Sequence, residues 1–233
     1  MHLQIPTFNL TKPKIITTSD GSHSLYVEHL DEHYHSVHGA VNEALHVFIK
    51  NGLEFVAKSK QEIRIFEMGL GTGLNALATK QFAQKNNLKI DYTSIEAYPL
   101  LWEECQTLNY LEELKVAELT SFFQSIHQAE WNKKIAIDKH FSLHKIHSKI
   151  EDVSLSDTFD LIYFDAFGPR AQGDMWTKEI FQKLHNATAN SGVFVTYCAK
   201  GQVRRDLESV GYTMERLQGP PGKREMLRGT KLI

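Results

Sequence analysis

Residues 63–75 read IRIFEMGLGTGLN, and this stretch decides the fold. A short, mostly apolar run at 63–67 is typical of a buried strand, and Gly69, Gly71 and Gly73 follow it at alternate positions. Glycine lets the backbone turn tightly and approach a ligand closely, and a helix that starts directly after the turn presents free N–H groups. The stretch therefore predicts a strand, a ligand-binding turn and a helix in succession.

The same alternation continues along the chain. The strand candidates are residues 63–67, 90–95, 141–146, 159–164 and 192–198, and the helix candidates are 74–85, 100–110, 114–128, 175–187 and 202–210. Continuous apolar strands separated by helices indicate a parallel sheet covered on both faces. A last pair, 212–217 and 224–228 around GPPG, predicts an antiparallel hairpin at one edge. The expected fold is a Rossmann-like, doubly wound α/β domain with a mostly parallel sheet and an antiparallel C-terminal edge hairpin.

Before the first strand the pattern is different. Residues 1–24 are polar and turn-rich and predict a short extended segment. Apolar residues at helical spacing predict a helix over 39–57, with Asn51-Gly52 as its C-terminal stop. We therefore expect an N-terminal extension, 1–60, packed on a domain, 61–233, the two forming one structural unit.

Composition restricts the class of protein. Of 233 residues, 42% are hydrophobic and 23% are charged, so a sizeable core is available. The longest apolar runs have four residues, far fewer than the roughly 20 that span a bilayer. The first residues, MHLQIPTFNL, lack the features of a signal peptide, and Cys105 and Cys198 suggest neither a disulfide framework nor a metal site. These features predict a soluble, cytoplasmic protein without a membrane partner.

Charge is unevenly distributed. The net charge of -2 excludes a generally basic nucleic-acid binder. Residues 200–233 nevertheless hold eight basic residues against four acidic ones. The basic segment 200–233 is either a solvated surface or a surface that binds phosphates.

Two acids define the expected ligand. Glu67 lies two residues before the first glycine, which disfavours a pyrophosphate and suits an amine-bearing ligand. Glu96 ends the second strand candidate, 27 residues after Gly69, where a carboxylate can accept hydrogen bonds from both hydroxyls of a ribose. Together with the turn, these acids predict a nucleoside ligand.

These residues resemble the first motif, E/D-x-G-x-G-x-G, of the class I S-adenosylmethionine-dependent methyltransferases. The resemblance implies S-adenosyl-L-methionine as cofactor, with Gly69, Gly71, Gly73 and Asn75 around it, Glu67 near its amino group and Glu96 on its ribose. The family often has an aspartate after the third strand. This sequence has KIHSK at 145–149 instead, so His147 or Ser148 is expected near the adenine.

A second informative stretch is FDLIYFDAFGP, residues 159–169. A strand here delivers Asp165 to its carboxyl end, while Asp160 at the opposite end is expected in a turn and Asp174 is expected to cap the next helix. DAFGP loosely resembles the D-P-P-Y pattern of amino-group methyltransferases, in which an acid receives the substrate amine and an aromatic group stacks on its base. The resemblance implies a catalytic Asp165, with Phe167 and Pro169 facing the substrate; the alternative is that Asp165 only caps the loop backbone.

Further stretches narrow the family. YHS (34–36), GTGLN (71–75), DAFGP with DMWT (174–177), GQVRRDL (201–207), GYTM (211–214) and GKREM (222–226) resemble the methyltransferase domain of the MnmC proteins and the stand-alone MnmD enzymes. That family methylates the amine of 5-aminomethyl-2-thiouridine at the tRNA wobble position. The resemblance implies Tyr34, His35 and Gly39 at the cofactor entrance. It also implies contacts to the anticodon arm of tRNA by Lys200, Arg204, Arg205, Lys223 and Arg224, and a separate oxidoreductase acting upstream.

Other functions remain open at this point. His29, His33, His35 and His38 lie close in sequence, but no cysteine pair or H-E-x-x-H accompanies them, so no metal is expected. An aminopropyltransferase of the spermidine-synthase kind also needs an acid beside an amine on this fold. A non-catalytic nucleoside- or RNA-binding domain is the third alternative.

Overall fold

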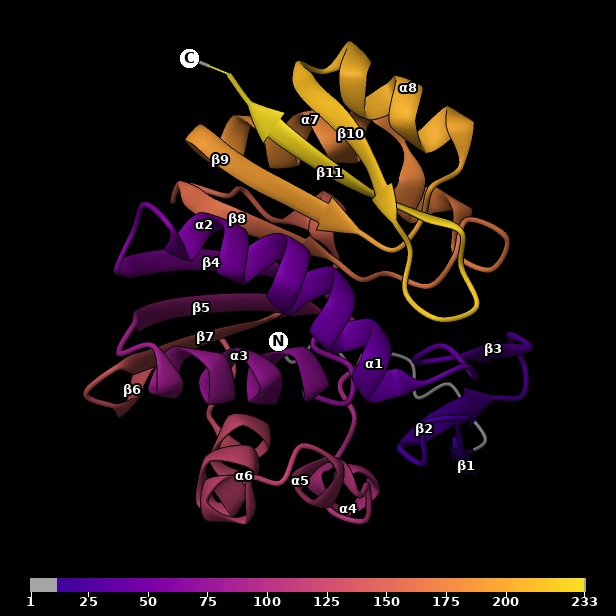
Figure 1. Ribbon diagram of the computed structural model, residues 1–233, viewed down its shortest axis with the longest axis vertical. Coiled ribbons are helices and arrows are strands. Elements are labelled where there is room, and N and C mark those ends of the chain that lie inside the picture. Colours follow the sequence, from indigo (N-terminus) through magenta and orange to yellow (C-terminus); the bar gives the residue numbers. More distant parts are fainter. Residues whose placement is uncertain (1–11, 233) are drawn as a thin grey trace, which may run out of the picture.

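An eight-stranded sheet forms the centre of the molecule in the computed structural model, which describes residues 12–232 (Figure 1). In spatial order its strands are β10 (Tyr212–Gln218), β11 (Glu225–Lys231), β9 (Thr188–Thr196), β8 (Phe159–Phe164), β4 (Glu62–Met68), β5 (Lys89–Glu96), β7 (Phe141–His147) and β6 (Lys134–Asp138). The five central strands, β9 to β7, are parallel, and β10, β11 and β6 run antiparallel to their neighbours. The predicted fold class and the C-terminal edge hairpin are confirmed.

Helices cover both faces of this sheet. They are α1 (Ala40–Ala44), η1 (Leu45–Leu53), α2 (Glu54–Ala57), α3 (Leu74–Lys85), α4 (Trp102–Cys105), α5 (Tyr110–Glu113), η2 (Ala117–Leu119), α6 (Thr120–Gln128), η3 (Ile150–Asp152), η4 (Gly173–Trp176), α7 (Lys178–Ala187) and α8 (Gly201–Ser209). No helix within residues 12–232 is long and apolar enough to cross a bilayer.

Strand β8 shows how the sequence fills both faces. All six of its residues are buried. Because side chains alternate along a strand, Leu161 and Tyr163 join the core beneath η1 and α3, whereas Ile162 and Phe164 join the core beneath α7 and α8. The continuous apolar run in the sequence therefore reflects a strand with two buried faces.

The N-terminal segment differs from its prediction. Strands β1 (Lys14–Thr17), β2 (His23–Val27) and β3 (Glu32–His33) form a separate antiparallel sheet. Figure 1 shows this small sheet beyond one end of the large sheet, the end at which β9 has its arrowhead. The expected extended backbone is found at Lys14–Thr17, but its pairing into a sheet was not predicted, and residues 1–11 lie outside the described residues.

The expected helix stop at Asn51-Gly52 is wrong, because α1, η1 and α2 form one continuous helical segment. A Cβ on Gly52 would lie 3.2 Å from Cγ2 of Val195 and 3.3 Å from Cε1 of Tyr163. This glycine therefore allows close helix–sheet packing and does not end the helix. Since Phe48 and Leu53 share one buried cluster with strand residues, we propose that the segment before β4 is an extension of the large-sheet unit.

Several other helix and strand boundaries differ from the predicted ones. Helix α7 begins at Lys178 with Thr177 as its cap, the Thr177 side chain accepting from the Ile180 N–H at 3.4 Å, and Asp174 lies earlier, in η4. The helix expected from 114 starts later because Lys115 has a φ of 54°, which right-handed helices do not allow. Strand β6 was not expected. It is an edge strand whose Ile135 and Ile137 are only half-buried.

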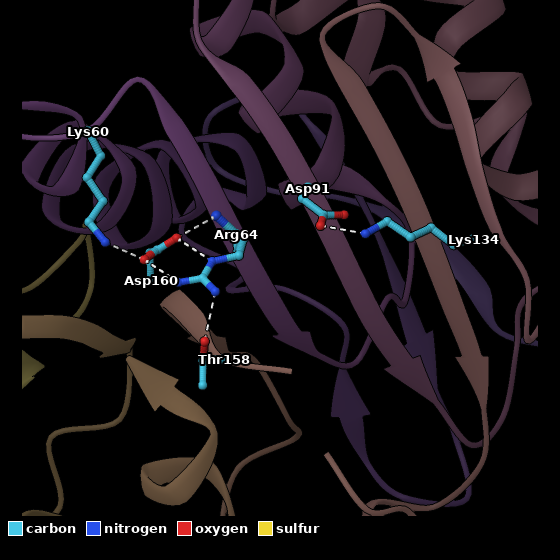
Figure 2. Close-up of polar contacts among 6 residues, drawn as sticks. All are labelled: Lys60, Arg64, Asp91, Lys134, Thr158 and Asp160. Atoms are coloured by element: carbon cyan, nitrogen blue, oxygen red, sulfur yellow. Dashed lines mark hydrogen bonds and ion pairs between the residues drawn. The ribbon is translucent and has the colours of Figure 1, made fainter. Parts of the chain in front are cut away.

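Asp160 lies within β8 rather than in the expected turn, and it is 3% exposed. Its Oδ2 accepts from the backbone N–H of Arg64 at 2.9 Å and from Arg64 Nε at 3.0 Å, and its Oδ1 accepts from Lys60 (Figure 2). Burial alone would raise the pKa of Asp160, but the hydrogen bonds from Arg64 and Lys60 outweigh it and lower the pKa. Asp160 therefore joins β4 to β8 at the amino end of the sheet.

We expect Asp160→Asn to reduce the free energy of unfolding by about 2–3 kcal/mol at pH 7, because the amide at this buried position loses the charge-assisted hydrogen bonds from Arg64 and Lys60. Since the pKa of Asp160 is lowered on folding, the stabilisation is present above its unfolded value of about 3.9 and is lost as the pH falls through the folded value. Urea unfolding at pH 7 and pH 3 measures both effects. Asp91→Asn is the control, because the Asp91–Lys134 pair (Figure 2) has exposed fractions of 35% and 54% and should contribute about 1 kcal/mol or less. Equal losses in the two variants would contradict the assignment.

Candidate functional site

A cavity of about 260 Å³ opens at the carboxyl ends of β4, β5 and β8. These strands are neighbours in the sheet, and the carboxyl ends of parallel strands are where ligands bind in open α/β folds. Nine of the predicted site residues line it: Tyr34, His35, Gly69, Gly71, Asn75, Glu96, Ser148, Asp165 and Phe167. The structure thus brings together the first glycine motif, the second acid and the β8 acid.

The glycine turn has a backbone that favours glycine. Gly69, Gly71 and Gly73 have φ of 88°, 49° and 75°, in the left-handed region where a Cβ is strained. A Cβ on Gly71 would lie 3.1 Å from Tyr34 Cδ1, and one on Gly73 would lie 2.9 Å from His127 Nε2. The turn is therefore held between the N-terminal segment and α6. Gly73 supports the turn without lining the cavity.

Glu96 ties the glycine turn to the end of β5. Its Oε2 accepts from the Gly71 N–H at 3.1 Å and its Oε1 accepts from the Tyr98 N–H at 2.9 Å. Burial raises the pKa of Glu96, and the two backbone N–H groups oppose that rise. A carboxylate held in this way at the cavity wall can also accept hydrogen bonds from ligand hydroxyls.

Glu67 lies behind the turn and does not line the cavity. It is fully buried, with Ser94 Oγ donating to its Oε2 at 2.9 Å, and its Oε1 has no partner among the described residues. Burial raises its pKa to about 8. Its expected contact with a ligand amino group stays a prediction.

Asp165 is held by Asn75 from the first turn of α3. Asn75 Nδ2 donates to Asp165 Oδ2 at 2.7 Å, and Asn75 is 3% exposed. Burial raises the pKa of the Asp165 carboxyl well above its usual range, and Glu43 adds to the rise. Within residues 12–232 this carboxylate accepts no backbone N–H of its own loop, contrary to the alternative that it only caps the loop. One oxygen is thus fixed by the amide, and the group faces the cavity.

Two aromatic rings form the wall beside Asp165. Tyr34 and Phe167 meet edge to face, with ring centroids 5.1 Å apart. Trp176 Nε1 donates to the Phe167 carbonyl at 2.7 Å, and the Phe167 N–H donates to Gln172 Oε1 at 3.2 Å. This fixed loop presents an aromatic surface suited to a flat ligand group. Pro169, in the same loop, does not line the cavity.

His35 connects the N-terminal segment to the glycine turn. Its Nε2 lies 2.8 Å from Thr72 Oγ1, which also accepts from Tyr110 OH at 3.2 Å. Thr72 Oγ1 thus links the His35 ring to the Tyr110 hydroxyl. Burial lowers the pKa of His35 to about 4, which favours the neutral ring.

This buried histidine should make stability depend on pH. In the unfolded chain a histidine has a pKa of about 6.5, so the His35 contribution is complete above pH 6.5 and is lost as the pH falls toward 4. Between pH 7 and pH 5 the loss is about 2 kcal/mol, and we expect His35→Gln to remove that part of the pH dependence. Urea unfolding at both pH values measures it, with His29→Gln, at an exposed position, as the control. An unchanged pH dependence in His35→Gln would refute the expectation.

Other predicted residues lie outside the cavity. Gly39 is buried at the start of α1, where a Cβ would lie 2.5 Å from Asp20 Oδ2. His147 is exposed and packs on Trp131, with ring centroids 5.6 Å apart. Ser148 reaches the cavity wall and His147 does not.

The predicted RNA-binding cations fall into two groups. Lys200, Arg205 and Arg224 are exposed. Arg204 pairs with Glu208 at 2.8 Å on α8, and Lys223 pairs with the buried Glu43. The side chains of the second group are already engaged within the protein.

Sequence reasoning missed part of the cavity wall. Tyr98, Ile150, Glu151, Gln172 and Asp174 also line it. Tyr98 could have been found, because it follows Glu96 by two residues and is an aromatic residue at a strand end. Ile150 and Glu151 lie in η3, Asp174 lies in η4 and Gln172 precedes η4, and such short segments carry no sequence pattern.

Metal-binding residues were not expected, and within residues 12–232 no three His, Cys, Asp or Glu side chains are grouped to hold a metal ion. Both cysteines are buried and free.

Two solved structures share the fold. MNMC2 from Aquifex aeolicus superposes with a TM-score of 0.74 at 22% identity, over 98% of this chain and 72% of that one. Spermidine synthase from Thermotoga maritima superposes with a TM-score of 0.60 at 11% identity, over the same shares. At these identities the likeness concerns the fold alone.

Sequence relatives are more specific. The tRNA 5-methylaminomethyl-2-thiouridine biosynthesis bifunctional protein MnmC of Leptospira interrogans is 30% identical over 218 residues, and the protein of the same name from Burkholderia mallei is 29% identical over 216. The alignments cover 87% and 84% of this chain but 33% and 32% of those proteins, so the chain spans about a third of their length. Residues 106–232 match the family described as S-adenosyl-L-methionine-dependent methyltransferase. The chain belongs to this methyltransferase family.

Proposed function

We propose that this chain methylates the amine of 5-aminomethyl-2-thiouridine at the wobble position of tRNA, giving 5-methylaminomethyl-2-thiouridine, with S-adenosyl-L-methionine as the methyl donor. The observation that carries the proposal is Asp165, fixed by Asn75 at the edge of a cavity whose other walls are the glycine turn, Glu96 and Phe167. The names of the Leptospira and Burkholderia relatives support the choice of nucleoside.

The donor set of the cavity fits this cofactor. Glu96 offers carboxylate oxygens to the ribose hydroxyls, and the glycine turn leaves room for the close approach of the methionine part. Asn75 Oδ1 is buried with no partner among the described residues, so it is an acceptor available to the cofactor ammonium group. When bound, S-adenosyl-L-methionine supplies an electrophilic methyl group on a sulfonium.

Asp165 acts on the substrate amine. An alkylamine resembles lysine, with a pKa of about 10, and is mostly protonated at neutral pH. The carboxylate oxygen of Asp165 that Asn75 does not engage accepts an N–H of the amine, takes its proton and orients the nitrogen lone pair toward the methyl group. Because burial and Glu43 raise the pKa of Asp165, it is a better proton acceptor than an exposed aspartate.

The wobble nucleobase and the RNA phosphates contact different side chains of the protein. Phe167 and Tyr34 offer ring surfaces for the flipped wobble base, which in a loop is partly unstacked before binding. The exposed Lys200, Arg205 and Arg224 offer positive charge to phosphates of the anticodon arm. In this proposal a separate oxidoreductase acts upstream and releases the free aminomethyl group. The methyltransferase itself acts in the cytoplasm.

The test combines the pure protein, S-adenosyl-L-methionine and tRNA from cells that lack this gene, with nucleoside analysis by mass spectrometry. The expected result is a gain of one methyl mass on the aminomethyl-thiouridine peak. No gain while cofactor binding is measured in the same sample would overturn the substrate assignment. In a separate reaction with putrescine and the decarboxylated cofactor, transfer of an aminopropyl group would instead identify an aminopropyltransferase.

A further inference from the structure

An ion pair between the buried Glu43 and the partly exposed Lys223 lies beside the loop that follows Asp165. Glu43, on α1, is 4% exposed, and Lys223, in the loop between β10 and β11, donates from Nζ to its Oε2. The same Nζ lies 3.8 Å from the centroid of the Tyr197 ring. The chain thus joins a cation and an anion 180 residues apart in sequence.

Both partners are fixed by their surroundings. Glu43 Oε1 accepts from the Ser36 N–H at 3.1 Å. The loop that carries Lys223 is docked closely on the N-terminal segment, since a Cβ on Gly222 would lie 2.0 Å from His38 Cδ2. The ion pair therefore has a defined place in the fold.

Tyr197 connects the Glu43–Lys223 ion pair to the loop that follows Asp165. Its hydroxyl donates to the carbonyl of Ala166 at 2.8 Å, and Ala166 follows Asp165 directly. Three parts of the chain far apart in sequence, α1, the end of β9 and the β10–β11 loop, thus meet at this loop.

The groups whose charge acts on the Asp165 carboxyl come from several elements. The charged or titratable ones are Glu67 on β4, Glu43 on α1, Lys223 in the β10–β11 loop, and the phenols Tyr92, Tyr110 and Tyr197. After burial, Glu43 is the next largest cause of the raised pKa of Asp165, with Glu67 in the same direction, and Lys223 opposes them. Asn75 contributes a hydrogen bond that also lowers the pKa.

We propose that Lys223 and Glu43 act as a matched pair of positioning residues on Asp165, Lys223 favouring its carboxylate form and Glu43 its protonated form. The pair thereby sets how readily Asp165 takes the proton of the substrate amine, which rests on the function proposed above. Lys223 is in this way assigned to the amine site, in place of the RNA phosphate expected from the sequence.

The test follows the Asp165 carboxyl carbon by NMR through a pH titration of the full chain labelled with ¹³C at aspartate carboxyls, the signal being identified by its absence in Asp165→Asn. We expect Lys223→Met to raise the midpoint and Glu43→Gln to lower it, each by about one pH unit. The double variant Glu43→Gln/Lys223→Met should return near the wild-type midpoint. Lys134→Met is the matched control, since its ion pair with Asp91 lies at the amino end of the sheet (Figure 2), and it should cause no shift.

Opposite shifts distinguish this proposal from a merely structural pair, whose loss would affect both variants alike. Shifts in the same direction, or no shift in either variant, would overturn it. If Lys223→Met does not fold, the midpoint of the Asp165 titration in Glu43→Gln tests the proposal by itself. A lower midpoint supports it, and a higher or unchanged midpoint overturns it. A Lys223→Met protein that binds tRNA more weakly with an unchanged Asp165 midpoint would also overturn it, in favour of an RNA contact. Because the titration uses no substrate, it stands apart from any failure of the tRNA assignment.

Discussion

Asp165→Asn is expected to lower kcat by about 10²- to 10⁴-fold, the usual contribution of a positioned acid or base. The amide has the same shape and keeps a partner for Asn75, but it cannot take the amine proton. The Kd for S-adenosyl-L-methionine should change little, because the proposed function assigns cofactor binding to Glu96 and the glycine turn. Single-turnover methylation measures the rate, and calorimetry measures the affinity.

Asp157→Asn is the matched control for this variant. Asp157 is exposed and precedes the other end of β8, so its rate should equal that of the wild type. Wild-type activity in Asp165→Asn would remove Asp165 from the mechanism and favour a non-catalytic nucleoside- or RNA-binding domain. A parallel loss of cofactor affinity would assign Asp165 to the cofactor site.

Glu96→Gln is expected to weaken S-adenosyl-L-methionine binding by about 100-fold. Both oxygens of Glu96 accept from backbone N–H groups, those of Gly71 and Tyr98, so a glutamine would turn its NH₂ group toward one of two donors. The variant would also lose the proposed charge-assisted hydrogen bonds to the ribose, each contributing about 1.5–3 kcal/mol. The kcat at saturating cofactor should stay within a few-fold of the wild type, since the proposed function assigns Glu96 to the cofactor and not to the amine.

The control for this variant is Glu62→Gln. Glu62 is an exposed residue at the amino end of β4, where it pairs with Lys89 at 3.4 Å, and its replacement should leave the Kd unchanged. Calorimetric titration with the cofactor compares the three proteins. If Glu96→Gln bound as tightly as Glu62→Gln, Glu96 would have no part in holding the ribose.

The sequence by itself was sufficient for features that depend on neighbouring residues. The run 63–75 predicted β4, the turn and the start of α3, because strand burial, the left-handed glycines and helix initiation are local properties. The alternation of strands and helices predicted the parallel sheet, and parallel strands place their carboxyl ends together. Glu96 and Asp165 could therefore be assigned to one site before any contact was known.

The tertiary structure alone decided contacts between residues far apart in the chain. Asn75 and Asp165 are 90 residues apart, and no spacing rule relates them. Gly52 resembled a helix stop, but its packing against β8 and β9 explains it, because local propensity yields to close contact with the sheet. Asp160 resembled a turn residue until Arg64 and Lys60 provided partners for a buried carboxylate. Lys223 resembled a surface cation until the fold placed it on the buried Glu43. Sequence pattern records which side chains are polar, whereas the partner of a buried charge is fixed only when distant segments pack together.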